Sequence, residues 1–110
     1  MSDIDIRVRQ NSKRNVIYFS VKSESKRHYL KKAEFCYYLK LLGVDFYCEA
    51  RINPKSRCDI YIPSKEVAVE ILDSESEENL VSKAKRYKCI VRGVSCMKEL
   101  DLEFVEKVVN

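Results

Sequence analysis

The stretch CDIYIPSKEVAVEIL, residues 58–72, contains two apolar runs separated by a short polar turn. Each run has the length and alternation of a strand, so we expect a β-hairpin closed by residues 63–66. In that register Ile60 lies opposite Val69. The aliphatic side chains all point to one face, which we expect to be the core: Ile60, Ile62, Val67, Val69 and Ile71.

The same register sends two carboxylates to the other face. Asp59 lies directly opposite Glu70, with their Cβ atoms about 4.5–5.5 Å apart. Two carboxylates at this distance repel, and burying them is unfavourable without a cation. Mg²⁺ or Mn²⁺ offsets that cost, because a hard cation takes oxygen ligands from one or two carboxylates, water and phosphate. The hairpin therefore predicts a divalent metal site at Asp59 and Glu70.

A third carboxylate comes from the preceding expected strand, VDFYCEARI, residues 44–52. A one-residue choice of register decides whether Glu49 shares a face with Asp59. We expect the same face, because this choice directs Phe46 and Cys48 toward the core. Ordinary ion pairs and solvation are the alternative: Asp59 with Arg51 or Arg57, Glu70 with a lysine, and Glu49 in solvent.

The remaining segments alternate between strand and helix patterns. Residues 4–10 and 16–22 predict an N-terminal hairpin. Helix formers from His28 to Leu42, ended by Gly43, predict a helix. We expect it to pack on the sheet through a stripe of four residues: Leu30, Ala33, Tyr37 and Leu41.

The C-terminal part predicts a helix at 73–87, a strand at 88–96 and a helix at 97–109, the last packing through Leu100, Phe104 and Val108. The strands at 67–72 and 88–96 are joined by a helix, so they should be parallel. The fold class is therefore α/β, with a mixed sheet flanked by helices.

Composition restricts the class of protein. The 110 residues suit a single domain spanning 1–110, and a hydrophobic fraction of 45% suits a packed core. Lysine and arginine exceed acidic residues by 21 to 17, which permits a nucleic-acid partner without requiring one. The five cysteines have no zinc-type spacing and are expected to be free thiols. With no signal core or spanning segment, we expect a cytoplasmic protein without a membrane partner.

The order of these segments resembles the PD-(D/E)XK nuclease-like superfamily, with the closest pattern in CoiA-type competence and restriction-endonuclease-like proteins. The upstream segment HYLKK strengthens the resemblance, because His28 and Lys32 are four apart and share one helix face. An acidic residue, a strand with Asp59, a turn and a strand with Glu70 follow. The resemblance implies a restriction-endonuclease-like αβββαβ core, here with an N-terminal hairpin and a C-terminal helix.

The resemblance also implies roles for single residues. Asp59 and Glu70 would bind Mg²⁺ or Mn²⁺, and Glu49 would be an accessory acid. His28 and Lys32, on an exposed polar flank of their helix, would contact the substrate phosphate or orient water. The helix at 73–87 carries two further basic residues suited to phosphate contacts, Lys83 and Arg86, although a solvated helix face explains them equally well.

Leu72 departs from the family pattern, which has a lysine two positions after the glutamate. A leucine cannot stabilise charge that develops on phosphorus. The lysine could come from elsewhere in the chain, with these candidates: Lys32, Lys83, Lys85 and Lys88. Alternatively, the fold has kept binding and lost cleavage, or the resemblance is only structural.

The expected function is a metal-dependent nuclease, endo- or exonucleolytic, acting on DNA rather than RNA. Two alternatives remain open at this stage. The chain could be a catalytically silent binding module with a nuclease-like fold. It could also be a small interaction protein whose N-terminal hairpin offers an edge strand for a homodimer.

Overall fold

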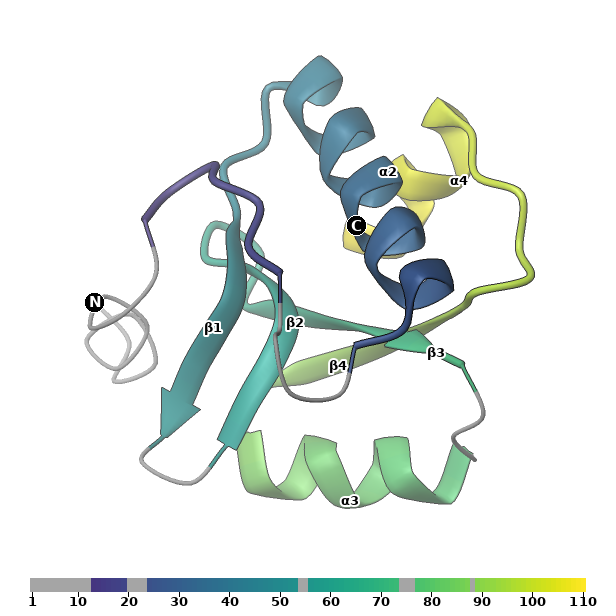
Figure 1. Ribbon diagram of the computed structural model, residues 1–110. Helices are drawn as coiled ribbons and strands as arrows, with labels where there is room; N and C mark the ends of the chain where they lie inside the picture. Colours follow the sequence, from purple (N-terminus) through teal and green to yellow (C-terminus); the bar gives the residue numbers. More distant parts are fainter. Residues whose placement is uncertain (1–12, 20–23, 54–55, 74–76, 88) are drawn as a thin grey trace.

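The computed structural model describes residues 13–19, 24–53, 56–73, 77–87 and 89–110. The described chain is an α/β fold, as predicted, and Figure 1 shows its helices and strands. In chain order these are α2 (Lys26–Leu42), β1 (Tyr47–Asn53), β2 (Ser56–Ile62), β3 (Val67–Leu72), α3 (Glu77–Tyr87), β4 (Ile90–Ser95) and α4 (Leu102–Val109).

The four strands form one mixed sheet in the order β1-β2-β3-β4. β2 is antiparallel to both β1 and β3, whereas β4 is parallel to β3, as expected for two strands joined through α3. The predicted register of the β2–β3 hairpin is confirmed, with Ile60 opposite Val69 and Ile62 opposite Val67. Its turn occupies the predicted residues 63–66.

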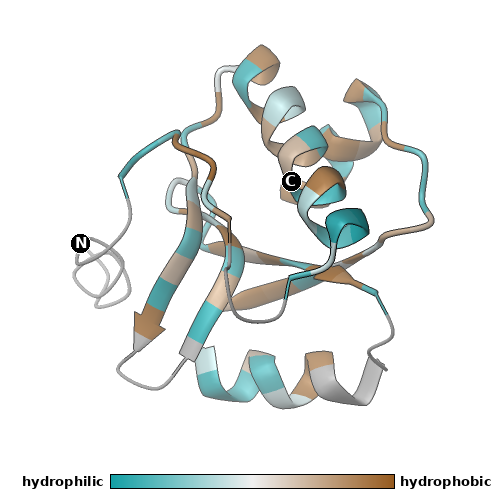
Figure 2. Ribbon diagram, in the orientation of Figure 1, coloured by the Kyte–Doolittle hydropathy of each residue, from teal (hydrophilic) through white to brown (hydrophobic). Residues whose placement is uncertain are grey.

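Helices cover both faces of this sheet. In Figure 1, α2 and α4 lie on one side and α3 lies on the other. The larger core cluster joins α2 and α4 to the face that carries Ile60 and Val69, so the predicted core face is confirmed. A smaller cluster gathers under α3, around Tyr61, Ala68 and Tyr87. Figure 2 shows that β3 is apolar along most of its length, which fits a strand covered on both faces.

Helix α2 has clear signals at both ends. The Ser25 side chain accepts a hydrogen bond from the His28 backbone N–H, which caps the first turn. Gly43 has a left-handed φ of 70°, and its N–H bonds to the carbonyls of Leu39 and Lys40. The helix therefore ends where the sequence predicts and begins two residues before His28.

The predicted packing face of α2 is wrong. Leu30, Tyr37 and Leu41 are 52%, 57% and 58% exposed. The buried residues are instead Lys32, Phe35, Cys36 and Leu39. Apolar residues lie on both sides of this helix, and Lys32 interrupts the buried side. For this reason, the regular spacing of the opposite stripe was misleading.

Helix α4 is shorter than predicted. It begins at Leu102 because Asp101 caps it, accepting a hydrogen bond of 2.8 Å from the Phe104 backbone N–H. Val105 and Val109 are its buried residues, while Phe104 and Val108 pack at the edge of the core.

The predicted N-terminal hairpin lies largely outside the described residues. Within 13–19, the structure records an isolated bridge between Arg14 and Tyr47. Among the described helices, none has the length and apolar character needed to cross a bilayer.

Two leucines on α2 test which face of the helix is buried. Leu39→Ala should lower the free energy of unfolding by about 2–5 kcal/mol, because Leu39 is completely buried. Leu41→Ala, the same change on the exposed side, should alter it by less than about 0.5 kcal/mol. Urea unfolding of both variants measures the difference. A larger loss of unfolding free energy for Leu41→Ala than for Leu39→Ala would support the packing face predicted from sequence.

Candidate functional site

The candidate site forms where β2 and β3 separate. Their recorded pairing ends at Ile60 and Val69, one step before Asp59 and Glu70. Beyond that point, side chains accept the backbone hydrogen bonds. The Ile71 N–H donates to Asp59 Oδ2 at 2.7 Å, and the Asp59 N–H donates to Glu70 Oε2 at 3.2 Å. The two carboxylates are therefore held together by the backbone of the strands that carry them.

Strand β1 changes direction at the same level. Glu49 has a φ of 52°, a left-handed conformation that costs a residue with a Cβ about 1–2 kcal/mol. Cys48 belongs to the cluster under α2, as predicted, whereas Ala50 belongs to the cluster under α3. The kink thus directs the Glu49 carboxylate to α2, where its Oε2 lies 3.2 Å from Lys32 Nζ.

A charged network extends from the sheet to the start of α2. His28 Nε2 lies 3.2 Å from Asp59 Oδ2, and His28 Nδ1 contacts Glu24 Oε2. Lys32 Nζ lies 2.8 Å from the Glu24 carboxylate in addition to its contact with Glu49. The Lys32 side chain has no exposed surface, so it holds the two glutamates by two buried ion pairs.

Helix α3 completes the site from the opposite face of the sheet. The Tyr87 hydroxyl donates to Glu70 Oε1 at 2.8 Å and lies 3.0 Å from the Arg57 carbonyl oxygen. Lys83 Nζ is 3.4 Å from the same Glu70 oxygen, and the Lys83 side chain is partly exposed. Glu70 is therefore buried but joined to a cation at the surface.

Burial and mutual repulsion control the protonation of the pair. Desolvation and the Asp59 charge raise the pKa of Glu70 from 4.5 to about 8. Desolvation also acts to raise the pKa of Asp59, but the hydrogen bond and charge of His28 outweigh it, so that pKa is lowered. At neutral pH, Asp59 is ionised and Glu70 is mostly protonated.

His28 is a cation at neutral pH. Its hydrogen bond to Asp59, aided by Glu24, outweighs desolvation and raises the pKa of the imidazole from 6.5 to about 9. Both ring nitrogens then donate, one to each carboxylate. The ionised Asp59 is thus already balanced by a positive charge within the chain.

The structure brings together most of the residues singled out in the sequence. Asp59, Glu70, Glu49, His28 and Lys32 all belong to the network, and Lys83 joins it from α3. Arg86 is exposed in the last turn of α3. The expected exposure of Lys32 is wrong, because its ammonium group is enclosed by Glu24 and Glu49.

Sequence reasoning missed two members of the network, Glu24 and Tyr87. Glu24 lies four residues before His28, so the series Glu24, His28, Lys32 at intervals of four was a usable signal. Tyr87 offered no comparable signal, because it ends a helix that reaches Glu70 only through the tertiary fold.

Leu72 has a structural explanation. It lies on the α3 side of β3, and a Cβ at Gly93 would be 2.8 Å from Leu72 Cδ1 and 2.6 Å from Leu80 Cδ1. The position two residues after Glu70 therefore packs tightly under α3. The cation beside Glu70 comes instead from Lys83, one of the four lysines considered from sequence.

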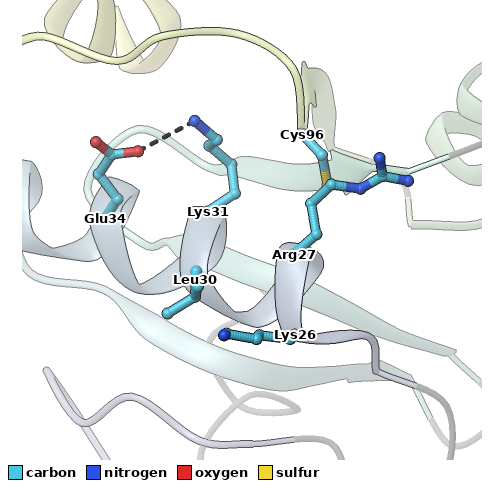
Figure 3. A pocket seen from close by; sticks show the side chains of 6 residues that line it. All are labelled: Lys26, Arg27, Leu30, Lys31, Glu34 and Cys96. Carbon is cyan, nitrogen blue, oxygen red and sulfur yellow. Dashed lines mark hydrogen bonds and ion pairs between the residues drawn. The ribbon is translucent and has the colours of Figure 1, made fainter.

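A groove of about 680 Å³ lies on another flank of α2. Figure 3 shows the residues that line it, including the ion pair between Lys31 and Glu34. Its lining is Lys26, Arg27, Leu30, Lys31, Glu34 and Cys96. None of the residues predicted to form the site is among them.

The chain matches no protein-family model, no curated protein and no solved structure. In the part of the chain that the structure describes, no group of three or more His, Cys, Asp or Glu side chains could hold a metal ion by itself.

Lys32 should be essential for stability. Lys32→Ala leaves Glu24 and Glu49 facing each other without the buried cation, and should cost about 3–5 kcal/mol. Lys40→Ala, an exposed lysine on the same helix, should change stability by less than about 0.5 kcal/mol. Denaturant unfolding distinguishes the two variants. A loss below about 1 kcal/mol for Lys32→Ala would mean that its ammonium group lies in solvent.

Stability should also fall as pH rises. Glu70 and His28 both have raised pKa values, so the folded chain keeps protons that the unfolded chain releases. The free energy of unfolding should therefore decrease between about pH 5 and pH 9. Glu70→Gln should flatten this decrease below about pH 8, and His28→Asn should flatten it from about pH 6.5 upward. Thermal unfolding in EDTA measures both, with Glu99→Gln as an exposed control; an unchanged slope would contradict the assigned protonation.

Proposed function

We propose that this chain is a divalent-metal-dependent nuclease acting on DNA, with the metal bound by Asp59 and Glu70. The observation that carries the proposal is the forced approach of these carboxylates where β2 and β3 separate, with Lys83 beside Glu70. The order from α2 to β4 supports it, because it matches the αβββαβ core of the nuclease-like superfamily.

The donor set suits a hard divalent cation. The pair carries close to one proton at neutral pH, because Glu70 ionises only near pH 8. Mg²⁺ or Mn²⁺ would take the place of that proton and accept oxygen from both carboxylates. Its other ligands would be water and substrate phosphate, which agrees with a site that supplies two protein carboxylates. When bound, the ion would polarise the scissile phosphate and lower the pKa of bound water.

Lys83 would take the role that the family pattern gives to the lysine after the glutamate. Its ammonium group lies 3.4 Å from Glu70 Oε1 and is partly exposed, so it can face both the carboxylate and an incoming phosphate. A fixed cation at this place would stabilise charge that develops on the phosphate oxygens.

His28 and α3 would help to hold the substrate and the site in place. The doubly hydrogen-bonded His28 fixes the orientation of Asp59. At the exposed end of α3, Arg86 would contact the phosphate backbone beside the cleaved bond.

A silent nucleic-acid-binding module is the second candidate. The His28 cation beside Asp59 and the Lys83 cation beside Glu70 favour it, since both carboxylates are compensated without a metal. In that case the basic surface would retain binding, and the acidic pair would have a structural role.

A cleavage assay separates the two candidates. Incubation of plasmid DNA and of a single strand with Mg²⁺ or Mn²⁺ should give cleavage that EDTA abolishes. Asp59→Asn should abolish cleavage and also the rise in Tm that Mn²⁺ produces. Lys83→Met should reduce the rate about 10²- to 10³-fold, the usual effect of removing one group that stabilises the transition state.

Lys85→Met is the matched control for Lys83, because it removes the same charge from the same helix and should leave the rate within about threefold. DNA binding that weakens with salt but never leads to cleavage would select the silent module. No metal effect on Tm together with no DNA binding would reject both candidates.

A further inference from the structure

An aromatic pair, with Phe19 exposed and Tyr29 half-buried, lies beside the charged network. Phe19, at the end of the described N-terminal segment, is 54% exposed. Its ring meets that of Tyr29, in the first turns of α2, edge to face, with centroids 5.5 Å apart and an interplanar angle of 80°. This contact involves one face of one ring, so aromatic surface on Phe19 is left open to solvent.

The pair is tied to the site through Tyr29. This residue directly follows His28, and Lys32 Nζ lies 5.6 Å from the centroid of its ring. That same ammonium group joins Glu24 and Glu49. An aromatic surface therefore begins next to the network that holds Asp59 in place.

A nucleic-acid strand is the partner expected at this surface, because the adjoining site is proposed to cleave DNA. Four of the six basic residues of α2 pair with carboxylates: Arg27, His28, Lys31 and Lys32. The other two, Lys26 and Lys40, are exposed. A nucleic-acid strand combines negative phosphates with flat bases, and stacking of bases on aromatic rings is a general mode of single-strand recognition.

We infer that Phe19 and Tyr29 form a stacking platform for an unpaired base, so that the site takes single-stranded or unpaired DNA in preference to duplex. The inference rests on the proposed function, because it names the substrate class of that site. In a duplex, the bases are stacked on one another and cannot reach a protein ring without being flipped out. A platform beside the acidic pair therefore selects substrates whose bases are already exposed.

The chain contains no tryptophan, which makes a clean reporter available. Phe19→Trp places one indole on the platform, and its fluorescence should be quenched when a short poly(dT) strand is added in EDTA. A blunt duplex should cause little quenching. In the same buffer, Phe19→Ala should weaken binding of poly(dT) about 5- to 150-fold, while duplex binding changes by less than about twofold. Phe19→Trp should retain the affinity of the natural chain.

Tyr37→Ala is the matched control, because Tyr37 is an equally exposed aromatic residue that lies eight residues further along α2 than Tyr29. It should leave both affinities unchanged. Equal losses for Phe19→Ala and Tyr37→Ala, equal losses for single strand and duplex, or no quenching by poly(dT) would each overturn the platform. Thermal unfolding shows whether each variant is folded. If Phe19→Ala does not fold, quenching of Phe19→Trp by poly(dT) still tests the platform.

Cleavage and stacking can fail separately. Quenching without metal-dependent cleavage would support the platform and reject the nuclease. Cleavage abolished by Asp59→Asn, but equal on single strand and duplex and unchanged in Phe19→Ala, would support the nuclease and reject the platform.

Discussion

The organisation of this protein depends on two carboxylates that act as backbone acceptors. Where β2 and β3 separate, Asp59 and Glu70 accept the N–H groups that a regular ladder would pair with carbonyls. Those N–H groups would otherwise be buried and unsatisfied, at a cost of about 1–3 kcal/mol each. The strands can therefore part without leaving donors unpaired. The opening between them is where charged groups from the two helical layers meet.

The two layers are joined through this opening. His28 on α2 and Lys83 on α3 lie on opposite faces of the sheet, yet each contacts one member of the pair. Glu24 and Lys32 extend the network into the α2 layer, and Tyr87 anchors it in the α3 layer. The network therefore joins the two layers by polar contacts, whereas the two apolar clusters lie on either side of the sheet.

The hairpin could be predicted from sequence because a one-residue shift would move every aliphatic side chain to the face that carries Asp59 and Glu70. The buried face of α2 could not be predicted in this way, because it contains Lys32, and a hydropathy pattern assigns a lysine to solvent. Lys32 is buried only because two glutamates from other segments surround it. Glu49 was placed on the correct strand, but its left-handed backbone has no signal in the sequence. Tyr87 and Lys83 reach Glu70 only because α3 packs across the sheet.

The spacing of Glu24, His28 and Lys32 has a consequence for how this chain can diverge. Each of the three side chains contacts another member of the series or a carboxylate on one of the strands. A change of charge at one position therefore leaves its partner without a counter-charge. Substitutions here are therefore expected to occur in compensating pairs, with Glu24 changing alongside Lys32 and His28 alongside Asp59. Distant relatives should be recognisable by these two covarying pairs, which are 8 and 31 residues apart in the chain, even where the strand sequences themselves have diverged beyond comparison.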